Sequence, residues 1–512
     1  MLKIGWSRKD VSTTDPLPIT GQFKLRVSQG VLDPILVNIL TLENNGEYVI
    51  FVQVDTVGIS PGILDLVRAR VSELNPEIDT TKIIMNATHT HCGPCLFEED
   101  KVWAGKPISE VPHEGVELKS NGAYRKWFLE TTAEGIVESF TGRKEGYVSY
   151  GYGFATVAHS RRVVYFDDTS KRPENANKNS AQFVGGHAAM YGSTNDPMFS
   201  HYEAGTDPFA NFLFTFDKDE KLTGAIINVP CPSQNSEMDN CLTADYWADV
   251  REQITKRYGD IHILSQCAAA GDLSPRILHY YKAEERRFRL KYADYKMPEL
   301  VSETYERYHR LDIGERIADA FDEVYAWAQK EKFDDLPIGH TVKTVELSKR
   351  LITDEEYRFC IEENEKNIVK KPFVTEGEPL ERMYQNSIIM SSGGRYARAM
   401  KRYEEQKKNP KFPTEIHVIK LGNIAFATNQ FELYMDYQHR IQGRSPFEQT
   451  FIVQLCGQPD SRSSGSYLAT ERGAAGKGYS ASMYCNLVSP EGGQELVEET
   501  LAELKKLKET NY

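Results

Sequence analysis

A strand–helix–strand unit near the N-terminus constrains the fold more than any other segment. Residues 46–57 (GEYVIFVQVDTV) form a β-branched apolar run, residues 62–74 follow as an amphipathic helix, and Lys82–Asn86 (KIIMN) form a second buried strand. A βαβ unit of this kind places its two strands parallel in a sheet that helices cover. The next residues, THTHCGP (88–94), therefore leave the C-terminal end of a buried strand, where α/β sheets place their ligands.

Similar alternation continues along the chain and predicts an α/β protein. Further strands are expected over 212–216, 225–229, 262–266, 340–347, 416–421 and 424–428, and further helices over 245–258 and 491–508. Apart from one strand, residues 298–410 are helical and charged. We expect mixed β-sheets flanked by helices, in one domain spanning residues 1–512 that carries a mainly helical insertion over about 298–410.

Composition and charge exclude several classes of protein. The chain has 61 basic and 74 acidic groups, whereas a nucleic-acid partner needs clustered Lys and Arg. The N-terminus lacks the apolar core of a signal peptide, and no stretch reaches the roughly 18 apolar residues of a membrane span. Eight cysteines in 512 residues are not a disulfide framework. We expect a cytoplasmic protein with no nucleic-acid partner and no integral membrane segment; the oligomeric state stays open.

The first chemical signal is a pair of histidines, His89 and His91, two residues apart. Side chains at i and i+2 of an extended segment point to the same face, so both rings could approach one site. One histidine would then be a metal ligand and the other an acid or base beside it. A pair of hydrogen-bonded loop histidines is the alternative.

Two further segments present polar side chains where strands end. CAAAGDLSP (267–275) has a small-residue turn that exposes Asp272 and Ser274, although Ser274 followed by proline is also typical of a helix start. NVPCPSQ (228–234) holds Cys231 rigidly between two prolines. A buried, inert cysteine is the ordinary alternative for Cys231.

Taken in order, these segments resemble the neutral ceramidase family, zinc-dependent amidases that release the fatty acid from the sphingoid amine. The opening IGWSRKDVS…LPITGQF is similar to that family's N-terminal pattern, THTHCGP to its THTHSGP, and GDLSP to its GDVSP-type motif. QFELYM resembles the family's glutamate segment and SYLAT…KGYSA its tyrosine segment. The resemblance extends over nearly all of residues 3–490.

The resemblance implies a hydrolase in which zinc-activated water attacks the amide carbonyl of a small-molecule or lipid N-acyl substrate. The implied metal ligands are His89, Glu432, Tyr467 and the residue at position 231. His91, Arg161, Ser274 and Tyr479 are implied to be catalytic, with Arg161 on the carbonyl oxygen and Tyr479 stabilising the oxyanion. Arg162, Asp272 and His201 are expected to bind substrate.

Several positions depart from the family's pattern. Cys231 stands where the family has a histidine ligand; a thiolate can bind zinc but would make the metal a poorer Lewis acid. Cys92 replaces a serine beside His91, and the family's C-terminal sandwich domain is expected to be missing. Two alternatives therefore stay open: a non-catalytic ligand-binding homologue, and a thiol-based hydrolase using Cys92 with His91.

An extra polar segment, residues 185–208, holds His201 and Glu203. Its length and lack of periodicity favour an ordered loop over the site that selects the substrate, and a plain surface excursion is the alternative.

Overall fold

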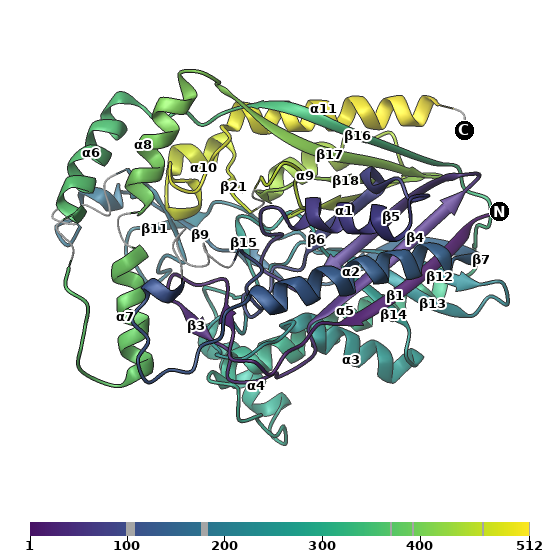
Figure 1. The fold of residues 1–512 in the computed structure, drawn as a ribbon, viewed down its shortest axis with the longest axis horizontal. Coiled ribbons are helices and arrows are strands. Elements are labelled where there is room, and N and C mark those ends of the chain that lie inside the picture. Colours follow the sequence, from purple (N-terminus) through teal and green to yellow (C-terminus); the bar gives the residue numbers. More distant parts are fainter. Residues whose placement is uncertain (99–107, 176–182, 369–370, 392–393, 463–464, 511–512) are drawn as a thin grey trace.

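Two stacked β-sheets form the centre of the protein. The computed structural model describes residues 1–98, 108–175, 183–368, 371–391, 394–462 and 465–510 (Figure 1). The larger sheet has eight strands in the order β14 (His262–Cys267), β13 (Leu222–Val229), β12 (Phe209–Asp217), β7 (Lys144–Phe154), β1 (Lys3–Asp10), β4 (Leu36–Asn44), β5 (Glu47–Val54) and β6 (Ile83–Ala87). The smaller sheet has the order β16 (Ile338–Ser348), β17 (Lys411–Leu421), β18 (Ile424–Thr428) and β20 (Gln449–Val453).

Helices cover the outer face of each sheet and complete four layers (Figure 1). The larger sheet is covered by α1 (Ile63–Leu74), α2 (Gly122–Thr141), α3 (Tyr246–Tyr258) and α5 (Thr304–Ala328). The smaller sheet is covered by α9 (Met435–Gln442) and α11 (Pro490–Glu509). The remaining helices are α4 (Tyr281–Lys291), α6 (Asp354–Ile368), α7 (Pro379–Ser391), α8 (Gly394–Gln406) and α10 (Glu471–Gly476).

Alternating side chains explain why both faces of the larger sheet are buried. In β12, Phe212 and Phe214 pack edge-on against Phe321 of α5. Leu213, between them, belongs to the cluster that the two sheets share, which also contains Phe426 of β18. Because successive residues of a strand point to opposite faces, an uninterrupted apolar run fits a strand covered on both sides.

The predicted fold class is confirmed. β5 and β6 pair in parallel through α1, and β12 and β13 pair antiparallel as a hairpin. The helical stretch over 298–410 is not one unit, because α5 packs with α3 on the larger sheet, whereas α6, α7 and α8 lie at one end of the molecule (Figure 1). The division into domains stays a prediction. Among the described residues, no helix is both long and apolar enough to cross a membrane.

The ends of several strands meet at one place. At the end of β6, Asn86 donates from Nδ2 to the carbonyl oxygen of Ser265 in β14, 3.1 Å away, and forms an isolated bridge with Cys456 after β20. The backbone N–H of Gln454 donates to the carbonyl oxygen of Cys267, at the end of β14, 3.1 Å away. The polar turns that follow these strands are therefore brought together.

Candidate functional site

His89 and His91 are brought together by a turn and not by strand alternation. β6 ends at Ala87, and His89 has a φ of 69°, in the left-handed region that side chains other than glycine rarely adopt. The Nε2 atoms of the two rings lie 3.3 Å apart, with the rings nearly perpendicular at 82°. Both rings thus share one site, as the sequence predicts, but the extended segment assumed for them is wrong.

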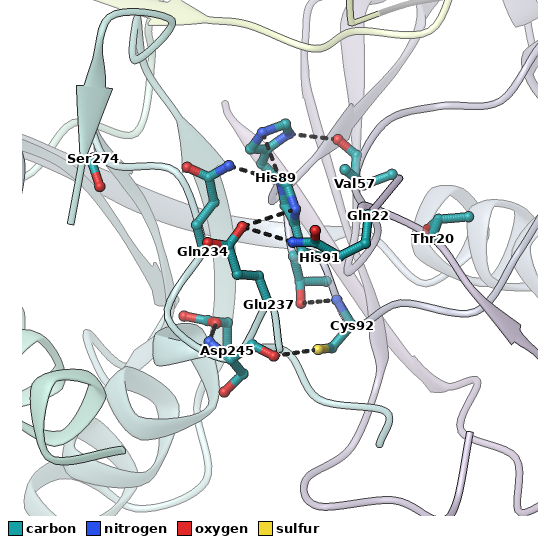
Figure 2. A network of polar contacts seen from close by, with 12 residues as sticks. Thr20, Gln22, Val57, His89, His91, Cys92, Gln234, Glu237, Asp245 and Ser274 are labelled. Atoms are coloured by element: carbon teal, nitrogen blue, oxygen red, sulfur yellow. Dashed lines mark hydrogen bonds and ion pairs between the residues drawn. The ribbon is translucent and has the colours of Figure 1, made fainter. Parts of the chain in front are cut away.

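Hydrogen bonds fix which nitrogen of each ring carries the proton. Nδ1 of His89 lies 2.7 Å from the carbonyl oxygen of Val57, which can only accept, so Nδ1 is protonated and Nε2 has a free lone pair (Figure 2). Nη1 of Arg161 donates to Oε1 of Gln234 (2.9 Å), which leaves the Gln234 amide nitrogen as the donor to Nε2 of His91, also 2.9 Å away. His91 must accept there, so its proton is on Nδ1.

His91 is held neutral by its surroundings. Burial, then the neighbouring His89 and several arginines, lowers the pKa of His91 well below its usual 6.5. Among the described residues its buried Nδ1 has no hydrogen-bond partner, and the Glu237 carboxylate lies 3.6 Å from it. Nε2 of His91 therefore accepts from Gln234 and lies beside Nε2 of His89, which keeps its own lone pair free.

Arg161 links the histidines to the glutamate and tyrosine segments. Its Nη2 lies 3.2 Å from the Tyr467 hydroxyl and 3.5 Å from Oε2 of Glu432, which is itself 3.5 Å from Nε2 of His89. Glu432 and Tyr467 are adjacent because the short strands β19 (Glu432–Leu433) and β21 (Tyr467–Leu468) pair in parallel. The resemblance places Arg161 on the substrate carbonyl oxygen. In the structure the Arg161 side chain has no exposed surface, so a direct contact with a substrate carbonyl is blocked.

Tyr191 joins the cluster from the segment 185–208. Its hydroxyl lies 3.4 Å from Nη1 of Arg161, 3.4 Å from Oε1 of Gln234 and 3.3 Å from Oγ of Ser274. Ser274 is fully buried and also accepts from the N–H of Arg276 (3.2 Å). The chain does not enter a helix at Pro275, since α4 begins only at Tyr281.

Part of this cluster reaches the surface. The side chains of His91 and Glu432 keep 10% and 11% of their surface exposed. Gly21, with a φ of 106°, lies against the His91 ring, where any Cβ would be 2.7 Å from it. Tyr479 stacks edge-on against Tyr467 on one side and the exposed Phe23 on the other.

Three residues expected to bind substrate do not face the cluster. Arg162 forms a two-pronged ion pair with buried Glu203, both contacts 2.7 Å, and also binds Ser480 and two backbone carbonyls. Asp272 accepts from the first N–H of α9, at Met435 (2.9 Å), and burial raises its pKa to about 6. Among the described residues, the polar partner of exposed His201 is Ser200. Arg162 and Asp272 therefore hold the structure together.

Cys231 is not brought to the cluster either. Its thiol donates to the carbonyl oxygen of Val157 (3.2 Å) and lies in the apolar core under α3 and α5, next to Cys267. Burial raises the pKa of Cys231 well above its usual range, which disfavours a thiolate. Three residues further on, Gln234 is the side chain of this turn that reaches the histidines.

The predicted zinc ligands do not fit a metal site in this geometry. Zinc takes at least three protein ligands. His89 and Glu432 are in contact, but the Tyr467 hydroxyl is bound by the Arg161 cation and Cys231 lies elsewhere. Within the ranges that the structure describes, no group of three or more His, Cys, Asp or Glu side chains is placed to hold a metal ion.

Cys92 is not a partner of the His91 ring. Its sulfur donates to the carbonyl oxygen of Ser236 (2.8 Å), on the side away from the ring (Figure 2). Burial raises the pKa of Cys92 to about 12, so the thiol is protonated at neutral pH. These contacts do not favour the thiol-based hydrolase alternative, because its nucleophile must be a thiolate within reach of a base.

Three residues of the site are missing from the sequence-based set: Tyr191, Gln234 and Glu237. Gln234 lies in the NVPCPSQ segment that the sequence already marks as a strand end, so a search of every polar residue there would include it. No local pattern marks Tyr191 or Glu237.

Known structures support the fold. The chain is similar to the crystal structure of neutral ceramidase from Pseudomonas aeruginosa, with a TM-score of 0.64 and 15% identity over 99% of this chain and 75% of that chain. A structure described as a ceramidase complexed with C2 gives a TM-score of 0.63 and 14% identity over the same shares. The protein has a ceramidase-like fold. No protein-family model and no curated protein sequence matches the chain.

Proposed function

We propose that this protein is a hydrolase that cleaves the amide bond of an N-acyl compound at the site around His89 and His91. The observation that carries the proposal is the buried contact between the His89 and His91 rings, flanked by Glu432 and the Arg161 charge. The ceramidase-like fold supports an amide as the bond to be cleaved and an acyl chain as part of the substrate.

The histidines supply acid–base chemistry. A water molecule attacks the carbonyl carbon and gives a proton either to the free lone pair on Nε2 of His89 or to Nε2 of His91, which then gives up its hydrogen bond from Gln234. Glu432 stabilises the positive charge that this proton brings. Because the pKa of His91 is lowered, the proton passes readily to the leaving nitrogen as the C–N bond breaks, yielding a carboxylic acid and an amine. The proposal assigns no step to zinc, since the predicted ligands do not assemble.

Turnover of a graded set of substrates tests this function. N-acyl derivatives of 7-amino-4-methylcoumarin, with acyl chains from acetyl to dodecanoyl, report amide cleavage by fluorescence. We expect cleavage by the wild type and loss of at least about 100-fold in His89→Ala. A wild type that releases no coumarin from any member of the set contradicts the proposal.

Metal analysis of the same preparations tests the part played by Cys231. We expect Cys231→Ala to keep activity within about threefold and to leave the metal content unchanged, because its thiol lies in the apolar core. Joint loss of bound zinc and activity in Cys231→Ala would restore the four-ligand site that the sequence implies.

A ligand-binding protein without turnover is the second candidate, favoured by the burial of Arg161 and Ser274, which have no exposed surface. Such a protein would bind an acyl compound with the same affinity in the wild type and in His89→Ala and would cleave none. A cytoplasmic location stays a prediction.

A further inference from the structure

We propose that Tyr191 is a catalytic residue whose hydroxyl donates a hydrogen bond to the carbonyl oxygen of the substrate as negative charge builds there. The inference rests on the proposed hydrolase function and adds a residue from the segment 185–208 to the site. It also identifies how that segment contributes, through Tyr191 and not through His201.

Strand pairing places Tyr191 beside Arg161. The strand β10 (Ala188–Met190) runs antiparallel to β9 (Arg162–Tyr165) and pairs Met190 with Arg162, so Tyr191 lies opposite Arg161. The N–H of Tyr191 donates to the carbonyl oxygen of Arg161 (2.7 Å). This pairing fixes the start of the Tyr191 side chain against the edge of the cluster.

The backbone at Tyr191 is in an unfavourable conformation. Its φ of 54° lies in the left-handed region, which is unfavourable for a residue with a Cβ. The turn is closed by Gly192, where any Cβ would lie 2.4 Å from the Tyr165 hydroxyl oxygen. Residues held in such conformations concentrate at functional sites.

The Tyr191 hydroxyl is free to bind a substrate. Its three polar neighbours lie at 3.3–3.4 Å, beyond the usual 2.7–2.8 Å of an O–H···O bond. Tyr191 is 37% exposed, whereas Arg161 and Ser274 are fully buried behind it. The Arg161 charge next to the hydroxyl strengthens it as a donor. Tyr191 is a partly exposed residue that contacts Arg161 directly, so it is the donor through which the buried arginine can act on a carbonyl oxygen.

Tyr479, which the resemblance assigns to the oxyanion, has a different environment. It begins the short helical turn η5 (Tyr479–Ala481), and its side chain hydrogen-bonds that of Cys485. Its ring lies between the rings of Tyr467 and Phe23 and is partly exposed. That position suits contact with an apolar part of the substrate.

Three tyrosine-to-phenylalanine variants test the assignment. In the coumarin assay we expect Tyr191→Phe to lower kcat about 100-fold with KM within threefold, the size of effect seen when one oxyanion donor is removed. Tyr479→Phe should lose less. Tyr165→Phe is the matched control from the same region, because its hydroxyl donates to the carbonyl oxygen of Ser193 (3.1 Å), and it should stay within threefold.

Calorimetric binding of octanoate gives a reading that needs no turnover, because its carboxylate resembles the product acid. We expect Tyr191→Phe to bind octanoate roughly tenfold more weakly than the wild type, and Tyr165→Phe to match the wild type. Weaker binding in Tyr191→Phe with no cleavage by the wild type would reject the hydrolase but keep the role of Tyr191. The inference is overturned if the wild type and Tyr191→Phe have the same kcat and the same affinity for octanoate. It is also overturned if the wild type neither cleaves a coumarin amide nor binds octanoate.

Discussion

The protein contains two buried pairs of contacting histidines, and their hydrogen bonds differ. In the smaller sheet, Nε2 of His340 lies 2.9 Å from Nδ1 of His417, while His340 also contacts the carbonyl of Tyr48 (3.3 Å) and His417 the carboxylate of Glu415 (3.2 Å). Every ring nitrogen of this pair has a partner. In the pair at the strand ends, Nδ1 of His91 has no hydrogen-bond partner within the described part of the chain.

This difference separates a structural pair from a reactive one. Partners on all four ring nitrogens offset the cost of burying these polar rings and leave no ring nitrogen for a ligand to bind. In the pair His89 and His91, Nε2 of His89 has a free lone pair and Nδ1 of His91 has no hydrogen-bond partner among the described residues, at a place where strands end and the His91 side chain is partly exposed. Burial alone therefore does not identify a functional histidine, whereas incomplete hydrogen bonding does.

Exchange of one histidine in each pair gives the largest expected effect. His91→Gln should lower the coumarin-releasing activity about 1,000-fold, because it removes the acid–base group. His417→Gln should leave activity within threefold but lower the unfolding free energy by about 2 kcal/mol, since it interrupts a satisfied buried chain. Activity assays and urea unfolding of both variants measure these two effects. An equal loss of activity in His91→Gln and His417→Gln would contradict the distinction between a reactive and a structural pair.

Substitution of Gln234 tests how the proton positions on the His91 ring are set. Gln234→Leu keeps the approximate size but removes the donor that fixes the proton-free nitrogen of His91, so we expect kcat to fall about 10- to 100-fold. The ¹⁵N chemical shifts of His91, assigned by comparison with His91→Gln, should show Nε2 unprotonated in the wild type and a mixture of tautomers in Gln234→Leu. Unchanged shifts would contradict the positioning role of Gln234.

The structural pair should be visible in the pH dependence of stability. Burial raises the pKa of Glu415, but the hydrogen bond with His417 and the Arg68 charge outweigh it and lower the pKa from 4.5 to about 2. A lowered carboxyl pKa contributes stability above pH 4.5 that is lost as the pH falls towards 2. Glu415→Gln should therefore be about 2 kcal/mol less stable than the wild type at pH 7.

The control for Glu415→Gln is the same comparison in acid. Urea unfolding at pH 7, 5, 4 and 3 should show the difference shrinking below pH 4.5, because protonated Glu415 loses its ionic partners. Arg68 and the two histidines are present in both proteins. A difference that stays constant down to pH 3 would mean that Glu415 contributes by packing and not by charge.

Much of the fold could be predicted from the sequence because the spacing of apolar residues that marks a strand or a helix is visible within a short stretch of chain. The apolar run before THTHCGP, the hairpin over β12 and β13 and the C-terminal helix α11 all lie where the patterns place them. Of the site, the order of motifs was enough to select His89, His91, Arg161, Ser274, Glu432 and Tyr467, which the structure brings into one connected set of contacts. Their chemical roles stay predictions.

Only the tertiary structure decided which side chain of each segment faces that site. Arg161 and Arg162 are adjacent, yet one joins the cluster and the other pairs with Glu203. In the turn after β13, Gln234 reaches His91 whereas Cys231 points into the core. Motif order cannot distinguish such neighbours, because side-chain direction depends on turn dihedrals and on pairing with strands distant in sequence. Tyr191 is the extreme case, since its place beside Arg161 is set by the pairing of β10 with β9.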